Sequence, residues 1–115
     1  MKQILSIRFF AGDSGKEPVR DWLKNDLSAQ DRKVIGEDIK TVQFRWPMGM
    51  PLVDHVTGDI WEVRIKLANR IARVLFVIIN NEMVLLHGFI KKSQSTPKPE
   101  LDLAKNRLKI LKGEK

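Results

Sequence analysis

The sequence predicts an α+β protein in which helices pack on one side of a mostly antiparallel sheet. Three features predict this class: two amphipathic helical segments between residues 18 and 46, three segments of strand character between residues 60 and 91, and an amphipathic segment over residues 97–112. With a first strand near the N-terminus, the order becomes strand, helix, helix, three strands, helix. The 115 residues fit one domain, residues 1–115, which can bury about two-thirds of its unfolded surface.

The first strand is predicted over residues 4–10, which are rich in Ile and Phe and precede turn residues at 11–15. Pro18 is expected near the start of a short helix, because proline fits the first turn. The apolar stripe of this helix consists of Val19, Trp22, Leu23 and Leu27. Ser28 is a suitable cap for a second helix, which Pro47 ends. The second helix buries residues spaced by four, three and four positions: Ile35, Ile39, Val42 and Trp46.

Residues 46–59 contain two Pro, two Gly and no clear period, so they are predicted to form a loop that partly packs down. His55 lies in this loop and is expected to be a surface or hydrogen-bonded residue. Residues 60–66 alternate between a polar face and a buried face. Residues 71–79 are apolar throughout except for Arg73, which predicts a central strand that is buried on both faces.

The third strand of this antiparallel meander is the apolar run of residues 83–90, which ends at Lys91 and Lys92. Thr96 is expected to cap the last helix, with Pro97 or Pro99 in its first turn. Four basic residues lie in that helix, where part of their charge complements the helix dipole: Lys105, Arg107, Lys109 and Lys112.

The composition favours a polyanionic partner and gives little support to a metal site. Twenty-one Lys and Arg against fourteen Asp and Glu give a net charge of +7, which fits nucleic acid or an acidic protein, although charge of this size also serves solubility. The chain has no cysteine and two histidines, so we expect no metal cofactor. No apolar run is long enough to span a membrane, and the first ten residues make a poor signal peptide. We therefore expect a cytoplasmic protein.

Four segments in the same order resemble a known family: GDIWEVRIK, RIARVLFVI, VLLHGFIKKSQSTP and ELDLAKNR, within residues 58–107. They are similar to the HigB-like, phage-derived branch of the RelE/ParE toxin superfamily. Its members carry a W-E-x-R strand, an arginine in the central strand, and a strand ending in H-x-F-x-K-K before a T-P helix start. The resemblance implies a toxin of a type II toxin–antitoxin pair, which acts as an mRNA interferase, often on the ribosome, and is neutralised by a cognate antitoxin. It also implies a RelE-like fold.

RNA cleavage without a metal requires fixed cations at the phosphorus and groups that move protons between the 2′-hydroxyl and the leaving oxygen. The predicted catalytic residues are Arg64, Arg73, His87 and Lys91. The predicted RNA-binding residues are Lys66, Phe89, Lys92 and Arg107. Glu62 is predicted to orient an arginine. We expect Arg64, Arg73 and one of the two strand-end lysines to converge on one concave surface, because strand alternation sends Lys91 and Lys92 to opposite faces.

Each of these residues also has a structural interpretation. Arg73 either pairs with a carboxylate such as Glu62 or points into an anion site, since a buried guanidinium without a partner is costly. Arg64 has an alternative as a solvated strand charge. His87 is either an acid–base group or a hydrogen-bonded core histidine. Phe89 either stacks on a base or packs in the core.

One departure from the family leaves alternatives open. Many RelE-type nucleases use a C-terminal tyrosine, and this chain has no tyrosine. Either His87 and the lysines perform the proton transfers, or catalysis is weak. The alternatives to an mRNA endonuclease are a ParE-like toxin that binds DNA gyrase and an inactive nucleic-acid-binding relic of phage origin. Converged phosphate ligands favour the nuclease, because a protein that binds gyrase does not need them.

Overall fold

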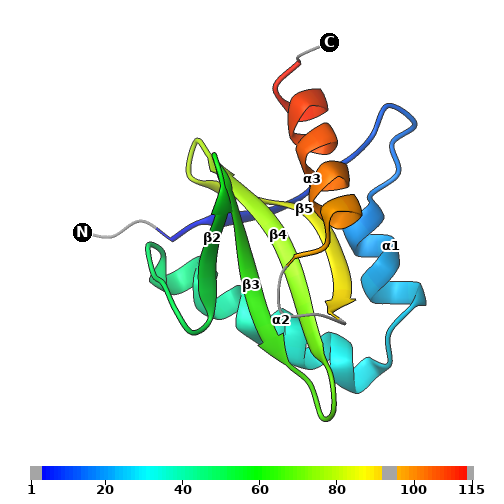
Figure 1. The fold of residues 1–115 in the computed structure, drawn as a ribbon, viewed down its shortest axis with the longest axis vertical. Helices are drawn as coiled ribbons and strands as arrows, with labels where there is room; N and C mark the ends of the chain where they lie inside the picture. Colours follow the sequence, from blue (N-terminus) through cyan, green and yellow to red (C-terminus); the bar gives the residue numbers. More distant parts are fainter. Residues whose placement is uncertain (1–3, 92–95, 114–115) are drawn as a thin grey trace.

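The computed structural model describes residues 4–91 and 96–113. Within this part, five strands form one sheet in the order β1-β5-β4-β3-β2, and three helices accompany it (Figure 1). The elements along the chain are β1 (Ser6–Phe9), α1 (Pro18–Asn25), α2 (Ala29–Arg45), β2 (Val53–Thr57), β3 (Ile60–Lys66), β4 (Ile71–Ile79), β5 (Glu82–Lys91) and α3 (Lys98–Leu111). The predicted α+β class and its mostly antiparallel sheet are confirmed.

The two N-terminal helices begin where the sequence predicts. Pro18 occupies the first turn of α1. The Ser28 hydroxyl accepts a hydrogen bond from the Asp31 backbone N–H at 3.1 Å, which caps α2. The buried side chains of α2 are the predicted Ile35, Ile39 and Val42. This apolar stripe holds α2 against the sheet.

The meander β3-β4-β5 is also as predicted. Asn80 and Asn81 have φ angles of 50° and 63°, which asparagine tolerates in the tight turn between β4 and β5. The middle residues of β4 are buried on both faces. At the outer side of β5, β1 pairs in parallel, with Ser6 opposite Glu82. The sheet is therefore antiparallel except for the parallel pair β1–β5 at one edge.

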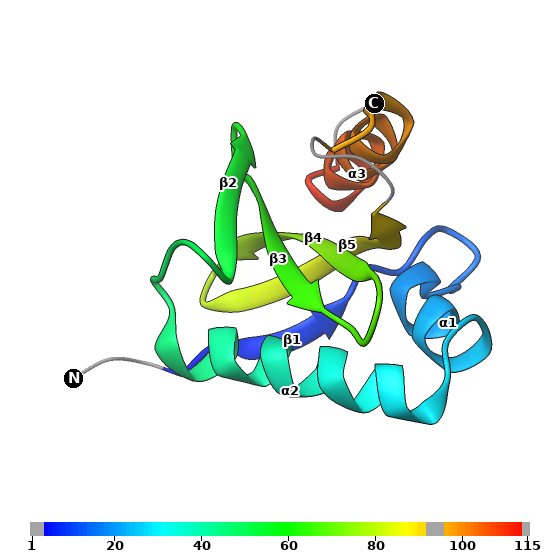
Figure 2. The same cartoon turned by 60° about the horizontal axis from the view of Figure 1, so that its bottom comes forward.

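Three expectations about these elements are wrong. Part of the predicted loop forms strand β2, because Val53 pairs with Val63 and extends the sheet antiparallel to β3. The helices do not share one side of the sheet: Figure 2 shows α1 and α2 below it and α3 above it. Thr96 does not cap α3, whose N-cap is Pro97 without a side-chain hydrogen bond. Pro99 does lie in the first turn.

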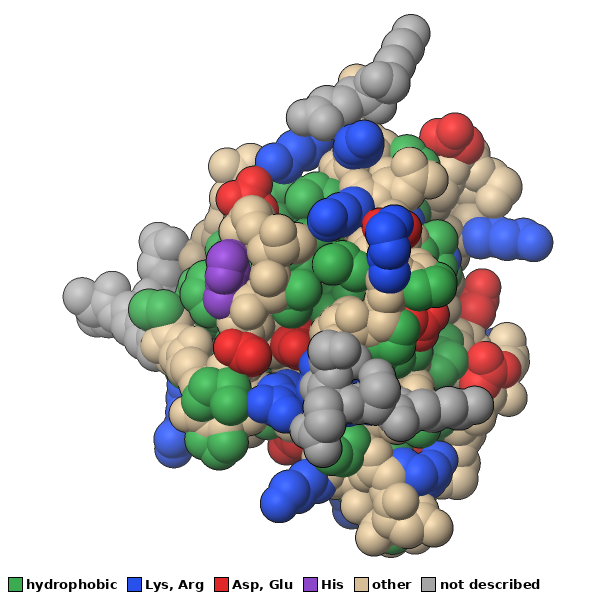
Figure 3. Space-filling model, viewed as in Figure 1, with side chains coloured by type: hydrophobic (Ala, Val, Ile, Leu, Met, Phe, Trp, Pro, Cys, Tyr) green, Lys and Arg blue, Asp and Glu red, His purple; other side chains and the backbone are tan. Residues whose placement is uncertain are grey.

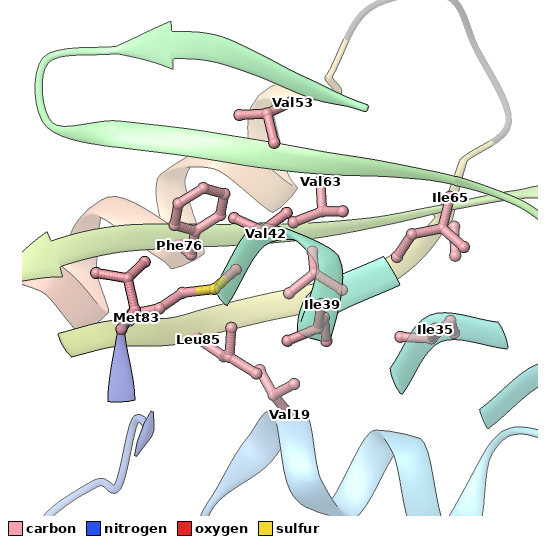
Figure 4. Packing of buried hydrophobic residues seen from close by; sticks show 13 residues of the cluster. Val19, Ile35, Ile39, Val42, Val53, Val63, Ile65, Phe76, Met83 and Leu85 are labelled. Carbon is pink, nitrogen blue, oxygen red and sulfur yellow. The ribbon is translucent and has the colours of Figure 1, made fainter. Parts of the chain in front are cut away.

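Each face of the sheet has its own hydrophobic cluster. The larger one lies between the sheet and the two N-terminal helices, and Figure 4 shows Ile39 and Val42 of α2 beside Phe76 and Leu85 of the sheet. The second cluster contains Leu75 and Leu86 of the sheet together with Ala104 of α3. Burial on both faces fixes the strand register, because a shift by one residue would exchange the two sets of side chains. No helix in residues 4–91 or 96–113 is long and apolar enough to cross a membrane.

A pair of glycine substitutions tests this packing with opposite expected signs. A methyl group at Gly88 in β5 would overlap the six-membered ring of Trp22, so Gly88→Ala should lower the free energy of unfolding by about 1–3 kcal/mol. Gly36 lies inside α2 with open space around it, so Gly36→Ala should raise stability by about 0.5–1 kcal/mol. Urea denaturation measures both. Equal, small effects would show that Trp22 does not pack on Gly88.

Candidate functional site

Strand register brings most of the predicted residues to one face of the sheet. Opposite residues on antiparallel strands point to the same side, and alternate residues along a strand share a face. Three cross-strand rows result on the face that α3 partly covers: Glu62–Leu75–His87, Arg64–Arg73–Phe89 and Lys66–Ile71–Lys91. In the first and third rows, polar or charged side chains flank a central apolar residue, Leu75 or Ile71. We call this grid the site face.

The central interaction of the site face is a buried ion pair between Arg73 and Glu62. One guanidinium nitrogen, Nη1, donates to both carboxylate oxygens of Glu62, at 2.8 and 2.6 Å. Both side chains are 4% exposed. The same nitrogen donates to the Thr96 hydroxyl at 3.1 Å, so the residue just before α3 is attached to the pair. The predicted partner of Arg73 is confirmed.

A hollow of about 290 Å³ opens beside this pair. Arg64 and Arg73 both line it, together with Glu62 and Thr96, and its remaining wall consists of residues 54–56 of β2 and Leu101 of α3. Arg64 Nη1 is 3.6 Å from the Met50 sulfur and has no closer side-chain partner among the described residues. Two guanidinium groups on one concave surface form a site that suits an anion such as a phosphate.

Lys91 lies on the same face at the end of β5, opposite Ile71. Burial lowers the pKa of its ammonium group, and the positive charges of Arg73 and Arg64 lower it further. These three cations are therefore close enough to repel one another. An anion that binds among them relieves this repulsion, and Lys91 gives up its proton more easily than an isolated lysine does.

His87 is held at both ring nitrogens by helix α3. Arg107 Nη1 lies 3.2 Å from Nδ1 and also donates to the Leu86 carbonyl at 2.8 Å. Because arginine only donates, Nδ1 accepts, and Nε2 carries the hydrogen that it donates to Glu100 Oε1 at 3.2 Å. Burial lowers the pKa of His87 below its ordinary value, while the hydrogen bond and charge of Glu100 oppose this shift. The ring is therefore held as a neutral tautomer between two α3 residues.

The remaining predicted residues differ in exposure. Phe89 is 7% exposed and its ring stacks on His87 with a centroid distance of 5.5 Å, so it packs as a core residue and its burial argues against base stacking. The Arg107 guanidinium forms hydrogen bonds with the Leu86 carbonyl and with His87. Lys66 is exposed at the end of β3. Lys92 lies outside the described residues. His55 Nε2 donates a hydrogen bond to the Gly58 carbonyl at 2.8 Å.

Sequence reasoning missed three contributors to the site. Asp54 enters the hollow because β2 pairs it with Glu62, and a segment predicted as a loop gave no such indication. Thr96 was expected to cap a helix and instead bonds the ion pair. Glu100 was not predicted to take part in the site. It lies seven positions before Arg107, a helical spacing that places both residues on one face of α3, and this spacing was the available signal for their contacts with His87.

Acidic and basic groups alternate on the exposed surface of this face. In Figure 3, blue cations lie next to red carboxylates and green apolar side chains, with no continuous basic surface. Within the described residues, no group of three or more His, Asp or Glu side chains is arranged to hold a metal ion.

Comparison with known proteins identifies the class. Residues 21–109 match the family described as Phage derived protein Gp49-like (DUF891), and the chain belongs to this family. A protein from Mycobacterium tuberculosis strain CDC 1551 / Oshkosh, named probable endoribonuclease HigB1, is 42% identical over 60 residues, which cover 52% of this chain and 48% of that protein. The HigB1 protein of strain ATCC 25618 / H37Rv gives the same values. The match thus spans about half the length of these relatives. The HigB-like resemblance is confirmed.

The ion pair can be tested by changing one or both partners. Glu62→Leu alone leaves the Arg73 charge buried without its carboxylate and should lower the free energy of unfolding by about 3–5 kcal/mol. Glu62→Leu combined with Arg73→Met removes both charges and should recover most of that loss. Urea denaturation of the three proteins measures this difference. If the single variant lost less than about 1 kcal/mol, the pair would be behaving as a solvated one.

The His87 environment predicts a dependence of stability on pH. The folded pKa lies below the ordinary value of 6.5, so the unfolded chain takes up a proton first as the pH falls through 6.5. The free energy of unfolding should therefore decrease between pH 7.5 and 5.5. In His87→Gln this decrease in the free energy of unfolding should be smaller. His55→Gln is the control, and its decrease should match that of the wild type. Thermal unfolding at several pH values measures the slopes, and equal slopes in all three proteins would contradict the prediction.

Proposed function

We propose that the protein is the toxin of a type II toxin–antitoxin pair and that it cleaves mRNA without a metal ion, on the ribosome in the cytoplasm. One observation carries the proposal: Arg64 and Arg73 line a single hollow on the site face, with Lys91 close enough for all three charges to interact. A phosphate in this hollow would meet the arginines of two adjacent strands, β3 and β4, beside the carboxylates Asp54 and Glu62. The name of the relatives, probable endoribonuclease HigB1, supports the same reaction class.

The proposed reaction begins when the 2′-hydroxyl of one nucleotide attacks the adjacent phosphorus. The bond to the 5′-oxygen breaks, leaving a 2′,3′-cyclic phosphate and a free 5′-hydroxyl. Negative charge builds up on the phosphorane between these steps, and Arg73 and Arg64 neutralise it from fixed positions. Glu62 holds the Arg73 guanidinium in place, so little reorganisation is needed when charge develops. Glu62 is thus the proposed orienting residue.

Two groups are proposed for the proton transfers. Lys91 has a lowered pKa, which increases the neutral fraction that can accept the 2′-hydroxyl proton, while the leaving 5′-oxygen takes its proton from the second group or from water. His87 is the second group, and Glu100 offsets part of the effect of burial and so keeps its pKa nearer to neutral. The chain contains no tyrosine, so the lysine and the histidine carry this chemistry. Lys66 and Lys92 are proposed to bind flanking phosphates.

The proposed protein partner is a cognate antitoxin. Arg64, Arg73 and Lys91 are cations that an acidic or amphipathic antitoxin segment would neutralise, which would block the RNA phosphate at the same time. Inhibition by simple occupation of the site requires no change in the sheet.

A single substitution tests the proposal. Lys91→Gln removes the proposed proton carrier at the end of β5 without removing a core side chain, so mRNA cleavage should fall by about 10²-fold or more. Lys33→Gln makes the same charge change on exposed α2, and should cleave like the wild type. The measurement is growth after induced expression, with new 5′ ends mapped by primer extension. Analysis of the new ends for a 2′,3′-cyclic phosphate and a free 5′-hydroxyl checks the proposed 2′-hydroxyl chemistry.

Other outcomes would redirect the assignment. Growth arrest with intact mRNA would favour a protein that poisons DNA gyrase. A folded wild-type protein that causes neither arrest nor cleavage would leave an inactive relic as the explanation. New ends that carry a 5′-phosphate and a 3′-hydroxyl would contradict the proposed metal-independent mechanism.

A further inference from the structure

A second hollow, of about 420 Å³, opens next to the candidate site. Its lining residues come from α2, from the segment before β2 and from the ends of β3 and β4: Asp38, Pro51, Leu52, Arg64, Lys66 and Ile71. Arg64 lines both hollows, so the two are neighbours. A polynucleotide that places a phosphate beside Arg73 and Arg64 therefore has its next residue at this second hollow.

The walls and rim of the second hollow suit a nucleotide. Pro51, Leu52 and Ile71 provide apolar surface, which a flat base can contact on its faces. Leu52 is fixed beside the sheet, because its carbonyl accepts a hydrogen bond from the Arg64 backbone N–H at 2.7 Å. Arg64 and Lys66 supply positive charge at the rim for the phosphate. Lys66 makes no hydrogen bond or ion pair with another residue in the described part of the chain.

Asp38 is the unusual member of this hollow. It is partly buried on α2, directly before the buried Ile39, and it forms no hydrogen bond or ion pair with any described residue. Burial raises its pKa, and the charge of the neighbouring Glu37 raises it further. A carboxylate in this position accepts hydrogen bonds at both oxygens and donates none. A ligand with two adjacent N–H donors would satisfy it.

We propose that the second hollow is a base-binding subsite for the nucleotide next to the scissile phosphate and that Asp38 selects guanine there. Guanine presents N1–H and N2–H side by side on its Watson–Crick edge, which matches two carboxylate oxygens. Adenine and cytosine each place a ring-nitrogen acceptor beside their amino group, and uracil places carbonyl oxygens on both sides of N3–H. These acceptors repel an ionised carboxylate. This inference rests on the proposed RNA cleavage, and it adds a preference for guanine beside the cut.

The test uses Asp38→Asn, which keeps the shape of the side chain and removes its charge. Cleavage sites are mapped on ribosomes that translate an mRNA library with randomised sequence, using the whole protein. The wild type should prefer guanine at one position beside the cut by about tenfold or more, the size expected for one paired hydrogen-bond contact. Asp38→Asn should lose that preference and still cut. Glu37→Gln removes the neighbouring exposed charge outside the hollow, and should keep the wild-type preference.

A binding measurement separates this proposal from the proposed function. Short RNAs made uncleavable by 2′-deoxy substitution, with each of the four bases in turn at the mapped position, are titrated into wild type and variants by fluorescence anisotropy. Tighter binding of the guanine RNA by wild type and Glu37→Gln, but not by Asp38→Asn, supports the subsite. Absence of mRNA cleavage by the wild type on translating ribosomes would refute the proposed function itself.

Two results would overturn the subsite alone. Cleavage with no base preference at any position beside the cut, or with a guanine preference that survives in Asp38→Asn, would show that Asp38 does not read a base. An Asp38→Asn protein that cuts with unchanged preference but binds its antitoxin more weakly would assign the hollow to the protein partner instead. Matching circular dichroism and melting temperatures of wild type and variant establish that the fold is the same.

Discussion

The buried ion pair between Arg73 and Glu62 is the constraint on which the site depends. Two charges that are 4% exposed are stable only while they remain hydrogen-bonded to each other, and their bond fixes β3 against β4 at one register. That register places Arg64 opposite Arg73 and sends Lys91 and Lys66 to the same face. The Thr96 hydroxyl accepts from Arg73, so the beginning of α3 depends on the pair as well. A structural bond thus helps to set the positions of Arg64, Lys66 and Lys91 on this face.

Helix α3 combines two structural roles on this face. Its apolar residues complete a second hydrophobic cluster with Leu75 and Leu86, which keeps part of the sheet dry. Its polar residues Glu100 and Arg107 hold the two nitrogens of His87. On the same face, Lys66 is exposed at the end of β3, whereas Arg73 in the middle row is buried.

Local arrangement of charge, more than total charge, supports the assignment to RNA. The net charge of +7 fits several kinds of partner, and Figure 3 shows cations and carboxylates interspersed on the face that carries the site. A hollow lined by two arginines, with a third cation whose pKa they lower, is a more specific feature. Membership in the phage-derived Gp49-like family and the partial match to proteins named HigB1 agree with that assignment. The adjacent hollow with its isolated carboxylate adds a source of base selectivity.

The sequence by itself determined the local elements and the chemistry available to them. Ser28, the stripe Ile35–Ile39–Val42 and the alternation of residues 60–66 reveal α2 and β3, because helix caps and side-chain periodicity act over a few residues. A lone arginine in an apolar strand likewise predicts its carboxylate partner. Only the tertiary structure decided that α3 crosses to the opposite face, that residues 53–57 join the sheet and that Thr96 bonds an ion pair. These outcomes depend on which surfaces remain exposed after the other elements have packed. No local pattern in the chain encodes which surfaces those are.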